Sequence, residues 1–163
     1  MPFSKLTEHS VVRWSLLGGF KLPSGNPVAA TPYTVSMAKV ARDNNTLLID
    51  PNAGAGDLTG PLCSPNFFRT SFTNWQPGYA MGKVAAEQKK KTAVTITWKY
   101  AAGEESIGGF KESFEAGGGK VTKELFLPFP QVEFQPLLTE IASLKPDVVY
   151  AFFAGGGAVK FVK

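Results

Sequence analysis

Apolar and polar positions follow two regular periods from residue 35 to the end of the chain, one typical of helices and one typical of strands. Helices are predicted where apolar residues recur at spacings of three and four, and strands where short runs are rich in Val, Ile and Phe. The predicted helices cover 35–45, 76–88, 104–116, 132–144 and a segment that begins after 154. The predicted strands cover 46–49, 66–70, 93–98, 121–126 and 148–153.

Strand and helix alternate in this order, and the strands are apolar enough to be buried on both faces. This pattern predicts an α/β fold, a Rossmann-like parallel sheet with helices on both faces. Ligands of such sheets bind at the carboxyl ends of the strands. The loops expected there, DPNAGAGD, KYAAGE and FAGGGA, are rich in small residues, which let the backbone approach a ligand closely.

The first 30 residues do not follow either period. The segment GGFKLPSGNPVAATP is rich in Gly and Pro, and the only strand candidate before it is a weak one at 11–17. The N-terminus has no continuous apolar segment followed by small residues, so it is not predicted to be a signal peptide. No run of eighteen apolar residues occurs, and no membrane span is predicted.

Composition and charge narrow the class of protein. The chain has 163 residues, of which 44% are hydrophobic and 18% charged, as expected for one ordinary domain or two small lobes. The net charge is +4, and the positively charged residues are scattered along the chain. The one basic run, 89–91, is best explained as a solvated loop. Nucleic acid is therefore not expected as a partner, because its binding needs a clustered basic face.

Few residues could carry catalysis or hold a metal ion. His9 is the only histidine and Cys63 the only cysteine, which argues against a histidine-based triad or zinc site and excludes an intrachain disulfide. Acids do occur in the loops Asp50–Asp57 and Glu104–Glu105, but no reactive Ser or Lys context stands beside them. We therefore expect neither an enzyme nor a metal or cofactor site.

The stretch IDPNAGAGDLTG, residues 49–60, resembles three kinds of loop and satisfies none of the sharp motifs. An EF-hand loop starting at Asp50 would need Glu where Pro61 stands. A phosphate-binding loop needs Lys and Ser or Thr after Gly60, and the dinucleotide fingerprint fails at Thr59. Two interpretations stay open, namely glycines that only make tight turns and an uncharged ligand loop.

Three longer motifs resemble a known family. They are LLIDPNAG, the segment FFRTS before a helix, and KPDVVYAFF after an amphipathic helix. Over residues 35–163 the chain is similar to the periplasmic solute-binding proteins of ABC transporters, in the branched-chain amino acid (Leu/Ile/Val-binding) receptor family. The branch that binds aromatic acids is the most similar one.

This resemblance implies a periplasmic-binding-protein type I fold, in which two α/β lobes close on a ligand without chemical turnover. It implies an amino acid or small aromatic acid as ligand, a membrane permease as partner, and a periplasmic location. Family members are about twice this length, so the resemblance also implies a truncated chain. We expect an unmatched irregular segment at 1–34, a partial first lobe with a crossover strand at 35–72, and a truncated second lobe at 73–163.

The resemblance also places the ligand contacts. In the first lobe it implies backbone N–H groups and an amide at Asn52, Ala53 and Gly54, which would meet the ligand carboxylate. A second contact loop, before the first helix, would contain Thr31. In the second lobe the implied contacts are Tyr100, Ala101, Ala102, Phe153, Ala154 and Gly155. A ligand-sensing regulatory domain of the same fold and an α/β enzyme domain stay as alternatives, and the identity of the solute stays open.

Overall fold

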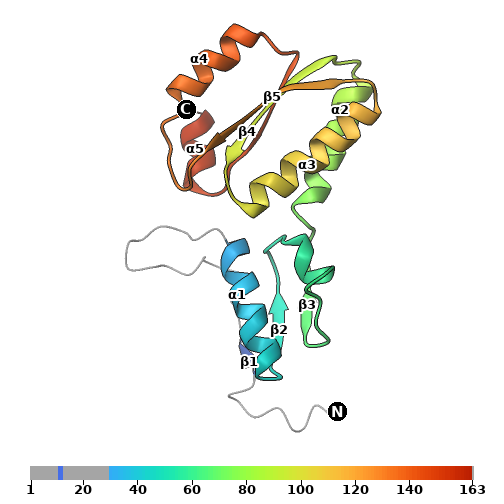
Figure 1. Cartoon of the computed structure of the whole chain (residues 1–163), viewed down its shortest axis with the longest axis vertical. Coiled ribbons are helices and arrows are strands. Elements are labelled where there is room, and N and C mark those ends of the chain that lie inside the picture. The colour runs from blue at the N-terminus through green and yellow to red at the C-terminus, as the bar shows by residue number, and fades with distance from the viewer. Residues whose placement is uncertain (1–10, 13–29, 163) are drawn as a thin grey trace. The chain divides into compact units, whose positions relative to one another are not determined.

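The computed structural model describes residues 11–12 and 30–162, which belong to two compact units, Met1–Thr73 and Asn74–Lys163 (Figure 1). The elements of the first unit are β1 (Val11–Val12), α1 (Ala30–Asp43), β2 (Leu47–Asp50), the short 3-10 helix η3 (Gly56–Thr59) and β3 (Phe67–Arg69). Those of the second unit are α2 (Trp75–Glu87), β4 (Thr92–Trp98), α3 (Ala101–Ala116), β5 (Lys120–Leu127), α4 (Gln135–Leu144), β6 (Val148–Phe152) and α5 (Gly156–Val162).

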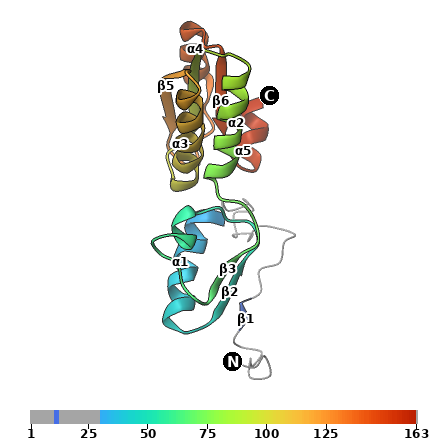
Figure 2. The same ribbon diagram turned by 90° about the vertical axis from the view of Figure 1, so that its right-hand side faces the viewer.

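The first unit is a parallel sheet in the order β1-β2-β3, covered on one face by α1 (Figure 2). Leu48 and Phe67 are paired across β2 and β3, and both are buried with Ala38 and Ala41 of α1. The next pair along these strands, Ile49 and Phe68, points to the opposite face of the sheet, since side chains alternate along a strand. On that face, opposite to α1, Ile49 is 44% exposed.

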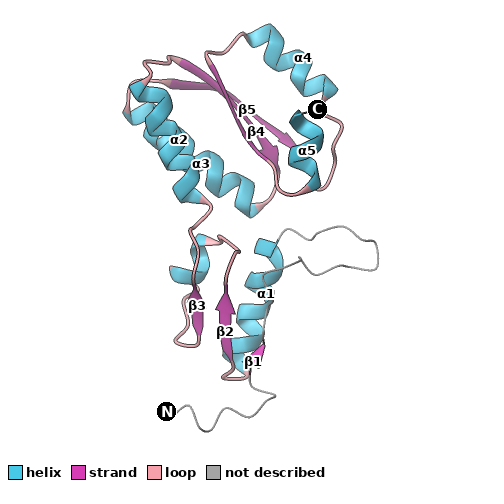
Figure 3. Cartoon of the chain, turned by 180° about the vertical axis from the view of Figure 1, so that it is seen from behind, coloured by secondary structure: helices cyan, strands magenta, loops and turns pink. Residues whose placement is uncertain are grey.

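The second unit is a parallel sheet in the order β5-β4-β6, with α2 and α3 on one face and α4 and α5 on the other (Figure 3). The central strand β4 is buried along almost its whole length. Val94, Ile96 and Trp98 pack in the core on the side of α4 and α5. Ala93 packs with Phe110 of α3 on the other side, so both faces of β4 contribute to a core.

Two glycines allow α2 and α3 to pack backbone against backbone. A Cβ atom at Gly78 would overlap the carbonyl oxygen of Ser106, and one at Gly82 would overlap the carbonyl oxygen of Phe110. The Ser113 hydroxyl donates a hydrogen bond to the Tyr79 carbonyl at 2.7 Å across the same contact. Any larger side chain at the two glycines would force these helices apart.

The predicted parallel α/β fold is confirmed, with differences at the ends of several elements. The first helix begins at Ala30, and Val40, which was expected on its apolar side, is 61% exposed. Residues 70–72 form an irregular connection where a crossover strand was expected, because β2 ends at Asp50 and leaves them no neighbouring strand. Of the segment expected to be irregular, residues 1–10 and 13–29 lie outside the described part of the chain.

Candidate ligand-binding site

The loop that follows β2 is organised by the buried carboxyl group of Asp50. Asp50 is 5% exposed, and its Oδ1 accepts hydrogen bonds from the backbone N–H of Asn52 at 3.0 Å and of Ala53 at 2.7 Å. This is the side-chain turn that Asp commonly makes with the backbone two and three residues ahead. In this structure the chain's own carboxyl group binds these two N–H groups, and their contact with a ligand carboxylate stays a prediction.

The rest of the first-unit loop still presents polar groups. The side chain of Asn52 is exposed, whereas Ala53 and Gly54 are buried. The N–H of Gly54 has no hydrogen-bond partner among residues 30–162. An exposed amide and a backbone N–H therefore remain in this loop as possible ligand contacts.

Arg69, the last residue of β3, holds the far end of the same loop. Its Nη1 donates to the Ala55 carbonyl at 2.7 Å, and its Nη2 donates to Thr59 Oγ1 at 2.6 Å. Thr59 in turn donates to the Gly56 carbonyl at 3.3 Å. The loop is therefore bound to the ends of both β2 and β3.

The second predicted contact in the first unit is not in a loop. The structure places Thr31 in the first turn of α1, which begins at Ala30. The expectation of a loop before the helix is corrected in that respect, because the helix extends five residues further towards the N-terminus than the apolar pattern indicated.

In the second unit, Tyr100 marks the junction of β4 and α3. It is the N-cap residue of α3 and has an extended backbone, with φ −159° and ψ 161°. Ala101 and Ala102 lie in the first turn of that helix rather than in the predicted loop, because two alanines after an extended residue readily start a helix. Ala101 is exposed and Ala102 is buried.

Aromatic rings gather at the carboxyl ends of the strands of the second unit, around Trp98. The ring centroid of Trp98 lies 6.2 Å from Tyr100, 5.1 Å from Phe129 and 5.1 Å from Phe153, each in an edge-on arrangement. Tyr100 and Phe129 stack at 5.4 Å with an angle of 27° between the planes. Trp98 is held in place because its Nε1 donates to the Gln131 carbonyl at 2.6 Å.

Sequence reasoning missed Phe129, which is 45% exposed and lies between two prolines in the connection from β5 to α4. The available signal was that this connection also follows the carboxyl end of a strand. The other predicted residues of this region are Phe153 and Ala154, both partly buried, and Gly155, which is exposed with φ +54°. The structure brings Tyr100, Phe129 and Phe153 together around Trp98.

Burial raises the pKa of the Tyr100 hydroxyl to about 12. The cause is desolvation, which disfavours the charged phenolate. The group is therefore neutral at physiological pH and can both donate and accept a hydrogen bond.

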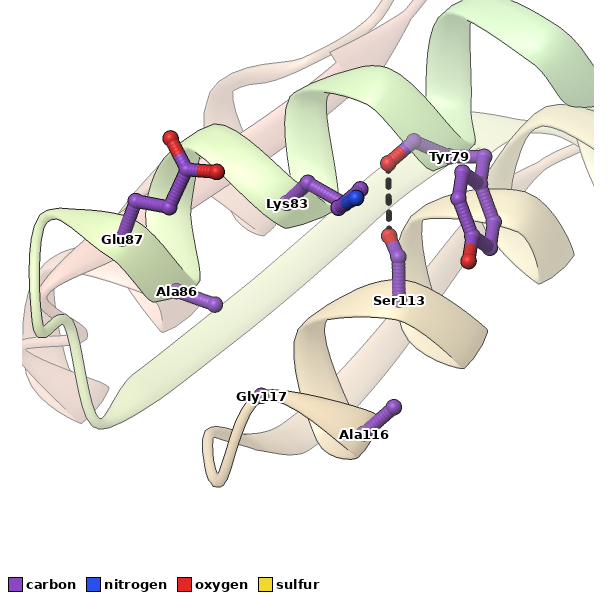
Figure 4. Close-up of a pocket in the computed structure, with 7 residues that line it drawn as sticks. All are labelled: Tyr79, Lys83, Ala86, Glu87, Ser113, Ala116 and Gly117. Carbon is purple, nitrogen blue, oxygen red and sulfur yellow. Dashed lines mark hydrogen bonds between the residues drawn. The ribbon is translucent and has the colours of Figure 1, made fainter.

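A separate open pocket of about 370 Å³ lies between α2 and the carboxyl-terminal part of α3 (Figure 4). Its lining residues are Tyr79, Lys83, Ala86, Glu87, Ser113, Ala116 and Gly117. None of these is a predicted site residue, and Tyr100 caps the opposite end of α3. No group of three metal-ligating side chains occurs in the part of the chain that the structure describes, and no helix there is long and apolar enough to cross a membrane.

Comparisons with known proteins agree on one family. The model of the family described as periplasmic binding protein matches residues 27–163. "Leu/Ile/Val-binding protein homolog 6" of Brucella abortus (strain 2308) is 26% identical over 126 residues, which are 77% of this chain and 32% of that protein.

Two solved structures are similar to the chain in both sequence and fold. One is a solute-binding protein of an ABC transporter from R. palustris in complex with benzoate, with 57% identity, a TM-score of 0.78, and coverage of 80% of this chain and 36% of that one. The other, from Rhodopseudomonas palustris BisB5, is in complex with 3,4-dihydroxybenzoic acid, with 32% identity, a TM-score of 0.73, and coverage of 81% and 37%. The chain thus spans about a third of the length of the relatives it matches.

Proposed function

The chain belongs to the periplasmic binding protein family, as its motifs indicated, and on this premise we propose that it forms part of the substrate-binding component of an ABC uptake system. The ligand that we propose is an aromatic carboxylate. The observation that carries this choice is the cluster of rings around Trp98 at the carboxyl ends of the strands of the second unit. The benzoate and dihydroxybenzoic acid complexes of its structural relatives support the same ligand class.

The exposed ring of Phe129, stacked on Tyr100, supports recognition of an aromatic ring. Aromatic pairs prefer offset-stacked or edge-on contacts, and such a pair contributes about 0.5–1.5 kcal/mol beyond the area it buries. Tyr100 adds a neutral hydroxyl group beside these rings, because burial keeps its pKa well above physiological pH. A flat ring with a polar substituent therefore suits this edge of the second unit better than a branched aliphatic side chain.

Each unit, taken by itself, offers neutral donors that suit a ligand carboxylate. In the first unit these are the exposed amide of Asn52 and the N–H of Gly54. In the second unit they are the N–H groups of the first turn of α3, which no residue of the helix itself can bind and which favour an anion. Such donors can bind and release a carboxylate, and we propose binding without chemical turnover.

The family description supports a periplasmic location and delivery to a membrane permease, both of which we include in the proposal. Specific delivery requires that the chain bind the solute and then release it unchanged. Calorimetry therefore has to be paired with an analysis of the recovered ligand.

Titration calorimetry with benzoate, 4-hydroxybenzoate and leucine tests the proposal. We expect heat of binding with the two aromatic acids and none with leucine. Phe129→Ala and Tyr100→Ala should each weaken benzoate binding by about tenfold, as expected when an aromatic contact worth about 1.5 kcal/mol is lost. Met81→Ala is the matched control, because Met81 is 50% exposed on α2. A folded sample that binds none of the aromatic acids would refute the proposed ligand class.

A further inference from the structure

The loop from Asn52 to Thr59 is held at both ends by charged side chains from neighbouring strands. Asp50 and Arg69 are paired in register as the last residues of β2 and β3. We infer that they are positioning residues, which fix the conformation of this loop so that its ligand contacts are formed before the ligand arrives. This inference rests on the proposed function, because it assigns a role to the loop in binding.

Asp50 fixes the first half of the loop. Its Oδ1 binds the N–H groups of two successive residues, Asn52 and Ala53, and the side chain is 5% exposed. The Asp50 carbonyl also accepts the N–H of Thr70 at 3.0 Å, which ties the strand end to the connection after β3. A buried acceptor that binds two successive N–H groups leaves this turn little freedom.

Arg69 fixes the second half. Its planar guanidinium group reaches the Ala55 carbonyl and the Thr59 hydroxyl at once, at 2.7 and 2.6 Å. Thr59 also donates to the Gly56 carbonyl, and the N–H of Leu58 binds the Ala55 carbonyl at 3.3 Å. These two bonds connect the groups that Arg69 holds to the rest of the loop. Two donors in a rigid fork fix both distance and direction, which a single ammonium group would not do.

The charges of Asp50 and Arg69 are opposite, yet no ion pair joins them within residues 30–162. Each side chain hydrogen-bonds the loop instead. Between the two fixed halves stands Gly54, whose N–H has no partner there. The arrangement therefore orders the residues around this donor without using the donor itself.

A loop that is already ordered costs less to immobilise on binding. Each freed side chain or turn costs about 0.5–1.5 kcal/mol when it has to be ordered again, which corresponds to a loss of affinity of about 2- to 13-fold. Loss of the Arg69 contacts should therefore raise the Kd for an aromatic carboxylate within this range, while the core under α1 stays intact.

The main test compares two substitutions at exposed Thr59 in the full chain. Thr59→Val removes the hydroxyl at nearly constant shape and should raise the Kd for benzoate about fivefold, whereas Thr59→Ser keeps the hydroxyl and should bind like the wild type. Arg69→Gln should raise the Kd for benzoate by a similar factor to Thr59→Val, because it removes the other partner of the same hydrogen bond. The matched control is Arg42→Gln, since Arg42 is also an arginine of the first unit but pairs only with exposed Asp43 among the residues described. Equal Kd values for Thr59→Val and Thr59→Ser would overturn the inference.

Amide hydrogen exchange separates this inference from the proposed function. If the wild type binds no aromatic carboxylate, the proposed function has failed and exchange of the Asn52, Ala53 and Leu58 amides decides the role of the two side chains. Exchange of the Leu58 amide should be several-fold faster in Arg69→Gln than in Arg42→Gln, because Arg69 holds the carbonyl that this amide binds, and equal rates would overturn the inference. Asp50→Asn replaces Asp50→Ala as the test variant, because alanine would remove a buried acceptor of the fold. Asparagine retains an acceptor oxygen and should keep slow exchange at Asn52 and Ala53, and loss of slow exchange there would count against the assigned role.

Discussion

Two buried hydroxyl groups of β4 differ in a way that only the structure reveals. Thr95 and Thr97 are both 0% exposed and, two residues apart, point to the same face of the sheet. Thr97 Oγ1 donates to the Phe152 carbonyl at 2.7 Å, whereas Thr95 Oγ1 has no partner among the described residues. A buried polar group without a partner costs free energy, and a hydrogen-bonded one does not.

Valine at these two positions should therefore have opposite effects. Thr95→Val should leave the free energy of unfolding unchanged or raise it by about 1 kcal/mol, and Thr97→Val should lower it by about 1 kcal/mol. Urea denaturation followed by circular dichroism measures both. A larger loss for Thr95→Val than for Thr97→Val would show that Thr95 has a partner after all.

The ionisation of Tyr100 can be measured directly. Its pKa in the folded chain is raised by burial from the usual 10.0 to about 12, so its contribution to stability is present below pH 10 and is lost as the pH rises through 12. Subtracting the tyrosinate absorbance titration of Tyr100→Phe from that of the wild type should isolate a step near pH 12. A step near pH 10 instead of pH 12 would show that this hydroxyl is solvated.

Part of the site could be predicted at the level of single residues, and part could not. Tyr100 and Phe153 stand directly after apolar strands, and the structure brings both to Trp98. The direction of the Asn52 and Ala53 N–H groups was beyond prediction, because it depends on whether the Asp50 side chain turns back along its own loop. Phe129 was missed because its connection lacks the glycines and alanines of the other strand-end loops.

At the level of whole elements, the contact between α2 and α3 depends on glycine. Gly82 faces the backbone of α3 at Phe110, whereas nothing lies within 4 Å of a Cβ atom added at Gly108. Both glycines are inside helices, where alanine is intrinsically preferred by about 1 kcal/mol. The two positions therefore separate helix propensity from packing.

Alanine at the two glycines should change stability in opposite directions. Gly108→Ala should stabilise the chain by up to about 1 kcal/mol. Gly82→Ala should destabilise it by about 1–3 kcal/mol, because the added methyl group must push the helices apart. Thermal and urea unfolding check both, and stabilisation by Gly82→Ala would mean that α2 and α3 are not in backbone contact.

The strands β4 and β6 are joined at their amino ends by Asp147. Its carboxylate accepts the N–H of Lys91 and of Thr92, each at 2.9 Å, and the Thr92 hydroxyl at 3.2 Å. The hydrogen bond from the Lys91 backbone and then that from Thr92 lower the pKa of Asp147 below its usual value of 3.8. A carboxylate with a lowered pKa stabilises the fold above its unfolded-state pKa, and this contribution disappears as the pH falls through the folded-state value.

Asp147→Asn should therefore lower stability at pH 7, and its difference from the wild type should shrink as the pH falls from 5 towards 2. The free energy of urea unfolding, measured at several pH values, gives this difference. Asp57→Asn is a suitable control, because Asp57 is an exposed acid of the first unit. A difference that does not change with pH would show that the carboxylate charge has no part in joining the strands.

The order of elements in the second unit followed from periodicity alone, because long apolar runs and amphipathic helices are strong signals. The start of α3 was predicted three residues late, at 104 instead of Ala101. The predicted start relied on acids in the first turn, whereas the observed one is set by the extended backbone of Tyr100. Helix boundaries of this kind depend on the backbone conformation of one residue, and the pattern of apolar and polar positions does not predict that conformation.

Taken as a whole, the described part of the chain exposes one apolar sheet surface. Ile49 and Phe68 are cross-strand neighbours of β2 and β3 and are 44% and 55% exposed, on the face of the sheet opposite to the one that packs against α1. Apolar sheet surfaces of this kind promote association.

Replacing both residues should make the chain less prone to associate. Ile49→Thr combined with Phe68→Thr keeps strand-favouring residues while removing apolar surface, so light scattering at high concentration should fall. Val159→Thr on α5 is the control, because Val159 is also 55% exposed but lies in the second unit. Unchanged scattering in the double variant would show that this surface does not drive association.

The setting of Trp98 has a practical consequence. Its indole is 4% exposed, carries a hydrogen bond from Nε1 and is surrounded by other rings, so its fluorescence should be blue-shifted and sensitive to any molecule that touches Tyr100 or Phe129. Trp75, by contrast, is 37% exposed and should emit like a solvated indole. The full chain has a third tryptophan, Trp14. In a background with both Trp14→Phe and Trp75→Phe, the protein would carry a native optical reporter beside its proposed ring contacts, and occupancy could be followed in real time without a label.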